Sequence, residues 1–392
     1  GNDWKLNAGV QYLNGKLHGY AVEANGIQDD GETLNRNYNY RELKWQDTDA
    51  QINLTGNFQL LGLAHTLVTG LEYENYDYKS YIIRSDAKSN NYPINIYDPV
   101  LGQPLPELKN ITTHDRENLK TTAVFAQDQI DLNERLSALL GLRFEHYEHD
   151  YKNLLPNTAN WNTSHDAFIP RLGLVFKARD DLSIYSNAAK SFKPNTGASR
   201  NGEGFDPEEG MAYELGFKWQ ALDNMLSVDS AIFYAKKENV LTLDPVDSAY
   251  KVAAGEVRSQ GIELNVAGQI TPAWKIIGGY AYTDAEVSKD NTLKKGTTLA
   301  NIPKNSFNLL NIYEFQDGPL QGLGLGINQK YIDKRAGQTA NSTYTMKGYA
   351  VTDLVSYYQA TPKLRINLDL KNLFDKVYDE SAFNLYVYPG ES

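Results

Sequence analysis

Residues 363–374 read Lys-Leu-Arg-Ile-Asn-Leu-Asp-Leu-Lys-Asn-Leu-Phe and carry the pattern that decides the fold. The aliphatic residues of this stretch share one parity, and the polar residues share the other: Leu364, Ile366, Leu368 and Leu370 against Arg365, Asn367, Asp369 and Lys371. A period of two predicts a β-strand with one apolar and one polar face. Such a strand fits a soluble sheet with one face on a core. It also fits a membrane barrel with lipid outside and a wet lumen inside.

The amino-acid composition excludes several classes of function and still allows a membrane barrel. The chain has 392 residues, a net charge of -11 and no cysteine. The acidic balance argues against nucleic acid as a partner, because phosphate binding needs positive charge. The absence of cysteine excludes disulfides and thiol-based metal or redox sites. The sequence contains 27 Tyr against three Met, and tyrosine suits both membrane–water interfaces and binding surfaces. A mean hydropathy of -0.52 still allows a barrel, whose strands present lipid only at every second residue.

The same alternation recurs along the chain and predicts about 16 strands. The first strand is expected at residues 4–12, followed by a turn at Asn14-Gly15-Lys16 and a second strand that runs from there to about Ala24. Further on, short turns such as 132–134, 179–181 and 222–224 alternate with long loops. This alternation is typical of an up-and-down antiparallel barrel with its short turns on one rim. Greek-key sandwiches instead mix loop lengths at both ends.

Aromatic residues lie near both predicted rims. One group lies within a few residues of the short turns: Tyr12, Phe176, Trp219, Trp274 and Tyr358. The other group lies nearer the long loops: Tyr147, Tyr234 and Tyr282. Two belts of this kind are expected where a barrel crosses the two membrane interfaces. The pattern therefore favours an all-β, antiparallel transmembrane β-barrel over a soluble sheet.

Several stretches in the second half resemble the TonB-dependent outer-membrane receptors, in particular the siderophore-receptor branch. They occur in the family's order: Phe205-Asp206-Pro207-Glu208 with Tyr213-Glu214-Leu215-Gly216, then Arg258-Ser259-Gln260-Gly261-Ile262-Glu263-Leu264, then Gly279-Tyr280-Ala281-Tyr282-Thr283, then Leu299-Ala300-Asn301-Ile302-Pro303, then Asn372-Leu373-Phe374-Asp375 with Tyr378, and finally Tyr388-Pro389-Gly390. Each stretch alone is weakly specific, but six in order are specific.

The resemblance implies a 22-stranded barrel around an N-terminal plug, in the outer membrane of a Gram-negative bacterium. Residues 1–392 are then expected to be an incomplete barrel with about 16 of the 22 strands. The plug, its energy-coupling motif, the first strands and the final strand are expected to lie outside this sequence. The implied partners are a ferric siderophore, TonB through the plug region, and outer-membrane lipid and lipopolysaccharide. No cofactor is expected, because ferric iron would enter only inside the bound siderophore.

Four aromatic residues of the long loops are the predicted ligand contacts: Tyr81, Trp161, Phe192 and Tyr386. Flat rings can stack on a chelator, and loops on a rigid scaffold often carry binding. The alternative for each is an interfacial anchor or a loop-packing ring. Inward-facing charges, including Arg143, Lys218, Glu263, Arg365 and Lys371, are expected to meet water or the plug, and some could help to hold an anionic chelate.

Neither a metal site nor catalysis is predicted. His146 and His149 fall three residues apart on one strand, so they point to opposite faces and cannot share an ion. A solvated strand end is the expected environment for both. The acidic pairs 180–181 and 208–209 lie in or beside connections, where adjacent carboxylates do not converge on one substrate. The glycines at 322, 324 and 326 alternate with apolar residues and are expected to relieve crowding on the lumen face rather than to bind phosphate.

The predicted function is therefore import of ferric siderophores, without enzymatic activity. The alternatives are a receptor of the same kind for haem, cobalamin or a saccharide, a passive porin, and a secreted carbohydrate-binding sheet. A haem receptor would be expected to place an axial histidine in a loop, for which only His114 and His165 are candidates.

Overall fold

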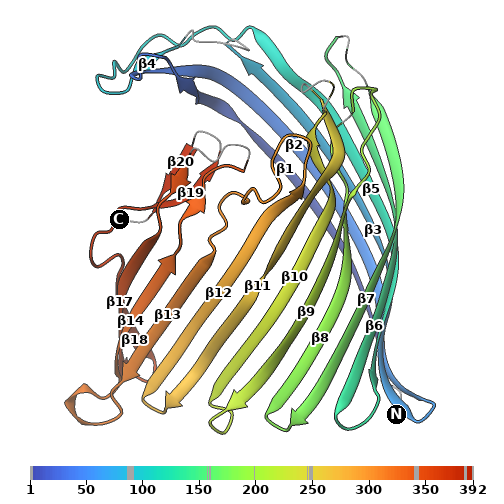
Figure 1. The fold of residues 1–392 in the computed structure, drawn as a ribbon, viewed down its shortest axis with the longest axis vertical. Helices are drawn as coiled ribbons and strands as arrows, with labels where there is room; N and C mark the ends of the chain where they lie inside the picture. Colours follow the sequence, from blue (N-terminus) through green and yellow to red (C-terminus); the bar gives the residue numbers. More distant parts are fainter. Residues whose placement is uncertain are drawn as a thin grey trace.

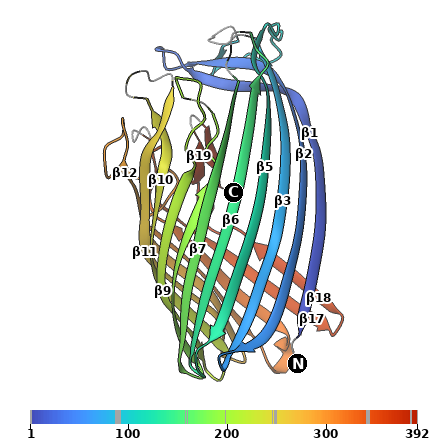
Figure 2. The same ribbon diagram turned by 90° about the vertical axis from the view of Figure 1, so that its right-hand side faces the viewer.

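A computed structural model describes residues 3–85, 92–156, 158, 160–197, 199–244, 246, 250–339, 344–383 and 386–390. These residues form one large antiparallel sheet of 16 strands whose neighbours follow the order of the chain. Figures 1 and 2 show the sheet as a tall, curved wall with the strands side by side. The predicted all-β antiparallel barrel architecture is confirmed, and so is the number of strands. No helix among the described residues is long and apolar enough to cross a membrane.

The wall is built from long strands joined by antiparallel pairing. In order along the sheet they are β1 (Trp4–Ile27), β2 (Thr33–Leu60), β3 (Leu63–Arg84), β5 (Asn110–Asp131), β6 (Leu136–Asn153), β7 (Trp161–Arg179), β8 (Leu182–Lys193), β9 (Glu208–Ala221), β10 (Leu226–Leu243), β11 (Lys251–Thr271), β12 (Trp274–Lys289), β13 (Asn305–Glu314), β14 (Leu323–Ile332), β17 (Tyr349–Thr361) and β18 (Leu364–Leu370). The two-residue strand β4 (Ile94–Asn95) pairs with β2 and completes the sheet.

Smaller elements lie in the connections. They are the 3-10 turn η1 (Gly318–Leu320) and the short hairpin of β15 (Arg335–Ala336) with β16 (Thr345–Met346), while a second short hairpin, β19 (Asp379–Phe383) with β20 (Tyr386–Pro389), follows the last strand of the sheet. Short turns gather at one rim of the wall and long connections at the other, as Figure 1 shows. This is the layout expected of short periplasmic turns and long extracellular loops.

The predicted turn at residues 14–16 is wrong. Strand β1 runs through it without interruption, and Gly15 pairs with Trp45 of β2. A Cβ atom at Gly15 would lie 2.1 Å from the Trp45 ring. The glycine therefore makes room for an indole from the neighbouring strand instead of bending the chain. The two expected strands merge into one, and β4 restores the count of 16.

The two faces of the wall differ as the alternation predicts. In the edge strand β18 all residues are exposed, and parity separates the aliphatic face from the polar one: Leu364, Ile366, Leu368 and Leu370 share one parity at 52%, 56%, 61% and 45% exposure. The outer face continues from strand to strand, because antiparallel partners such as Leu215, Ile232 and Ile262 share one side of the sheet. An exposed apolar band of this extent is unfavourable in water but suits lipid. The opposite parity carries the polar residues and forms the inner wall.

Gly324 of β14 faces a large aromatic ring on that inner wall. A Cβ atom at Gly324 would lie 2.3 Å from the ring of Tyr357. Gly324 and Tyr357 are direct partners across β14 and β17. The prediction that glycine relieves crowding on the lumen face is confirmed here, and a side chain of the barrel itself causes the crowding.

A charged clamp closes the short turn between β7 and β8. Trp219 Nε1 donates to Asp181 Oδ2 at 2.9 Å, and Arg179 Nε donates to Asp181 Oδ1 at 2.9 Å. The indole hydrogen bond first, and then the Arg179 guanidinium, hold the pKa of Asp181 below its ordinary value of 3.8, although desolvation opposes them. The interfacial tryptophan is therefore tied to a turn outside the membrane.

The clamp is expected to loosen only in acid. A carboxyl group whose pKa is lowered by folding contributes stability above its unfolded pKa and loses it as pH falls through the folded pKa. The fluorescence difference between the native protein and Trp219→Phe should therefore change in acid with a midpoint below pH 3.8. In Asp181→Asn that change should be absent. A midpoint of this fluorescence change above pH 3.8 would show that Asp181 does not hold Trp219 in the way described.

Candidate functional site

Four neighbouring rungs of the inner wall bring together aromatic and acidic side chains from β2, β3, β5 and β6. Their members are Gln51–Glu72–Ala123–Glu145, Asp49–Glu74–Thr121–Tyr147, Asp47–Tyr76–Leu119–His149 and Trp45–Tyr78–Glu117–Tyr151. Direct cross-strand partners share one face of a sheet at about 5 Å. The rungs therefore form one continuous surface, which we call the upper wall. It lies on the inner face, because its parity is opposite to that of the exposed Leu71, Leu142 and Phe144.

The aromatic part of the upper wall is tightly packed. Tyr151 stacks on Trp161 of β7 with ring centroids 5.3 Å apart, and the His149 ring meets the Trp161 ring edge-on at 4.5 Å. Tyr147 touches His149 and also Phe192, the latter at 6.4 Å. Trp161 is 7% exposed, Tyr147 2% and His149 1%. The structure thus brings two of the four predicted contact residues, Trp161 and Phe192, into one cluster.

The connection between β8 and β9 covers part of this cluster. A Cβ atom at Gly204 would lie 3.4 Å from the Trp161 ring, and the neighbouring Phe205 is 6% exposed. Asn195 anchors the connection by donating from Nδ2 to the backbone oxygens of Asp206 and Asn239, at 2.7 and 2.8 Å. The segment Phe205-Asp206-Pro207 therefore holds a long loop against the inner wall.

Two residues of the cluster correct the sequence-based expectations. Tyr147 was assigned to the outer aromatic belt, but it lies on the inner face because its register partner is Thr121. His149 was expected at a solvated strand end, but Trp161 and Tyr147 bury it, and its Nε2 lies 3.2 Å from Glu117 Oε2. His146 points to the opposite face and meets Asp166 at 2.8 Å. The two histidines lie on opposite faces of β6, as their spacing predicts.

The upper wall is strongly acidic. It carries six carboxylates: Asp47, Asp49, Glu72, Glu74, Glu117 and Glu145. The four rungs contain no lysine or arginine. Arg143, one rung below, pairs with Glu72 at 2.8 Å and with Glu145 at 2.7 Å. The remaining carboxylates make no ion pair with lysine or arginine in the described part of the chain.

The other two predicted contact residues lie elsewhere. Tyr81 is in β3 rather than in a loop, because that strand runs on to Arg84. It shares the outward parity of Leu71 and meets His114 edge-on at 5.3 Å. Tyr386 begins β20, and its side chain lies outside the described residues.

A second inner-wall cluster lies near the short turns. Lys275 Nζ is 2.6 Å from Glu314 Oε2, and the Tyr357 hydroxyl donates to the same carboxylate. The Arg365 guanidinium lies 3.7 Å above the Tyr357 ring. The predicted inward position of Arg365 is confirmed. Because these charges satisfy one another, the cluster is self-contained.

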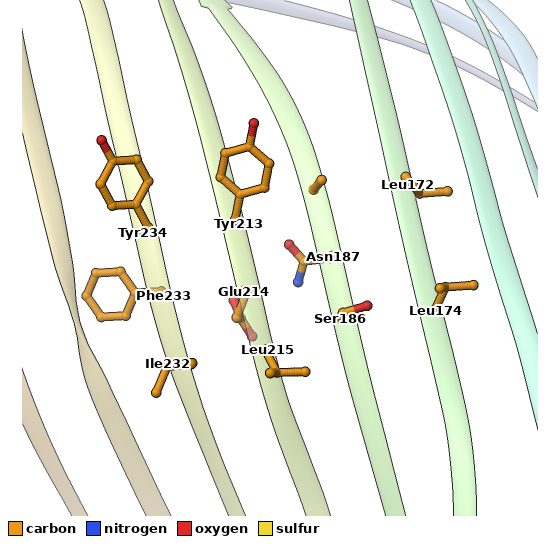
Figure 3. Close-up of a pocket in the computed structure, with 11 residues that line it drawn as sticks. Leu172, Leu174, Ser186, Asn187, Tyr213, Glu214, Leu215, Ile232, Phe233 and Tyr234 are labelled. Carbon is orange, nitrogen blue, oxygen red and sulfur yellow. The ribbon is translucent and has the colours of Figure 1, made fainter.

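The outer face has shallow grooves rather than a chemical site. One groove forms where the small side chains of Ser186 and Ala188 lie between larger residues. Figure 3 shows Leu172 and Leu174 on one side of it and Tyr213 and Tyr234 on the other, with both hydroxyls at the long-loop ends of their rings. That orientation suits tyrosines whose rings meet acyl chains and whose hydroxyls reach the headgroups.

Residues that could hold a metal ion directly are not grouped together. Among the described residues, no three His, Cys, Asp or Glu side chains converge in a metal-binding group. What the inner wall offers instead is a concave surface of aromatic rings and carboxylates. Such a surface can stack on and hydrogen-bond a chelate that already encloses its metal.

An up-and-down wall with an apolar outer face, a polar inner face and long loops at one rim is typical of a β-barrel of the outer membrane. Residues 1–373 match the family model described as "TonB dependent receptor-like, beta-barrel". The chain belongs to this family, and the predicted family and outer-membrane location are confirmed.

Relatives and solved structures agree with this assignment. The chain is 39% identical over 394 residues to the "Metal-pseudopaline receptor CntO" of Pseudomonas aeruginosa (strain UCBPP-PA14), covering 99% of this chain and 56% of that protein. It is 30% identical over 372 residues to the "Ferrichrome outer membrane transporter/phage receptor" of Escherichia coli (strain K12), covering 91% and 48%. The crystal structure of the siderophore receptor PiuA from Acinetobacter baumannii superposes with a TM-score of 0.84 at 25% identity, covering 98% and 60%. The chain therefore spans about half the length of the curated relatives that it matches.

Proposed function

We propose that this chain is the barrel of a receptor that imports ferric siderophores across the outer membrane, with energy from the TonB inner-membrane complex. The observation that carries the proposal is the aromatic cluster of Trp161, Tyr147 and His149 on the inner wall of a barrel of this family. Import breaks no bond, so the protein acts as a transporter and not as an enzyme. The iron enters as cargo inside the chelator and requires no resident cofactor.

A broader range of metals is the second candidate. The relative with 39% identity is named a metal-pseudopaline receptor, and that name is not restricted to iron. The upper wall supports this candidate equally well, because its side chains would contact the chelator and not the metal. Haem is less well supported. His114 packs against Tyr81 on the outer parity, and His165 Nε2 bonds to Thr163 Oγ1 at 2.8 Å.

Growth tests the proposal. An iron-restricted strain without its own siderophore receptors should grow when it carries the full-length gene and is given one ferric siderophore from a broad panel. Replacing ferric iron by nickel, cobalt or zinc chelates of the same compounds, in strains starved of those metals, separates the two candidates. Failure of every chelate to restore growth would contradict both.

Trp161→Ala is expected to weaken binding of the growth-supporting chelate by about tenfold, the loss typical of a buried aromatic contact. Isothermal titration with the purified full-length receptor measures the affinity. Tyr213→Ala, which removes a ring from the outer face, is the matched control and should bind as the native receptor does. Equal affinity of all three proteins would exclude a role for the aromatic cluster.

A further inference from the structure

The upper wall places carboxylates that have no lysine or arginine partner among the described residues beside half-buried tyrosine rings. Asp49 and Glu74 are direct partners across β2 and β3, and like charges in that position repel each other. Neither makes an ion pair with a lysine or arginine in the described ranges of the chain. One rung away, Tyr76 and Tyr78 stack with centroids 6.2 Å apart. A positive group placed here would relieve the repulsion.

A buried polar atom on the same rung points to a ligand. Tyr147 is 2% exposed, and its hydroxyl has no hydrogen-bond partner among the described residues. It shares the rung of Asp49 and Glu74 and lies one rung from Asp47. A buried hydroxyl without a partner costs free energy unless something completes its hydrogen bonding.

The chemistry of this surface selects the charge and the type of group. Carboxylates attract any cation, but aromatic faces next to carboxylates particularly favour an alkylammonium group, which gains cation–π and charge-assisted contacts together. An anionic chelate, such as a ferric tris-catecholate, would meet the same carboxylates at close range and be repelled. Arg143 is already shared by Glu72 and Glu145 and so offers an anion little compensation.

We propose that the upper wall binds the protonated amine of a metal chelate, so that the receptor prefers chelates with a pendant alkylammonium group. This inference rests on the proposed function and names the class of its substrate. The sequence-based expectation that inner-wall charges help to hold an anionic chelate is thereby reversed for this part of the barrel. The negative wall also raises the local concentration of cationic chelates in the lumen.

A matched pair of ligands tests the proposal with the full-length receptor in detergent. One is a linear ferric tris-hydroxamate with a free terminal ammonium group, and the other is the same compound with that amine acetylated. The iron coordination is identical, so only the charge differs. The ammonium form should bind at least about tenfold more tightly at low salt, the effect of one charge-assisted contact. That preference should shrink as salt screens the wall.

The double variant Asp49→Asn, Glu74→Gln should lose most of this preference and bind both forms within about twofold. Because this double variant removes a repulsion, its barrel should remain folded. The heat-dependent change in its electrophoretic mobility measures this. Glu148→Gln, on the outward parity of β6, is the control and should keep the native preference.

Each possible result of these binding experiments either supports or overturns the proposal. Equal binding of the two forms by the native receptor, tighter binding of a ferric tris-catecholate, or a preference that survives in the double variant would overturn the proposal. All three results would leave the proposed import function intact. If no chelate bound and none supported growth, the proposed function itself would fail.

Discussion

Replacing Leu368 by arginine is expected to destabilise the folded barrel by about 2–4 kcal/mol, the cost of a lipid-facing arginine near the middle of the membrane. Leu368 is 61% exposed and lies on the outward parity of β18. Asp369→Arg adds the same side chain one residue away, on the inner parity, where water can solvate it. It should cost less than about 1 kcal/mol.

Urea unfolding of the full-length receptor in lipid vesicles measures this difference. The two variants should separate clearly, with Leu368→Arg less stable and Asp369→Arg close to the native protein. Equal destabilisation by both substitutions would mean that β18 does not divide lipid from lumen as the alternation of its residues indicates.

Gly261→Val is expected to prevent normal assembly of the barrel. A Cβ atom at Gly261 would lie 2.0 Å from the backbone oxygen of Tyr282 and 2.9 Å from the Phe233 ring. Backbone atoms of a paired strand cannot move aside, so the cost should exceed the roughly 1–3 kcal/mol typical of overpacking. The glycine of the Arg258-Ser259-Gln260-Gly261 motif thus keeps β11 and β12 in register.

Electrophoresis with and without heating reports the folded fraction of this variant. Gly19→Val is the matched control, because a Cβ atom at Gly19 would meet nothing within 4 Å and valine favours strands. Gly19→Val should fold as the native protein does. A fully folded Gly261→Val would show that β11 and β12 pair differently.

The faces of the strands were predictable from local pattern alone. In residues 363–374 the parity of the leucines identifies the lipid face, and the structure exposes all four aliphatic side chains of β18 on it. The turn at residues 14–16 could not be judged in this way. Asn-Gly favours a hairpin locally, and only the partner strand reveals that Gly15 lies under Trp45.

The upper wall was not predictable, because it is assembled across strands. Asp49, Glu74 and Tyr147 are far apart in the sequence and meet only through the register of β2, β3, β5 and β6. The ring of Trp161 and a predicted loop point to ligand contact, although Trp161 begins strand β7. Nothing in the local sequence indicates its neighbours Tyr151 and His149. The alternation of residues along β6 did indicate the inward position of Tyr147, since Tyr147 shares its parity with the inward-facing Arg143.

Energy-dependent uptake tests the central claim most directly. Cells carrying the full-length receptor should accumulate a radioactive ferric siderophore when the TonB complex is present and bind it only at the surface when TonB is deleted. Equal accumulation in both strains would contradict the account and identify a passive pore.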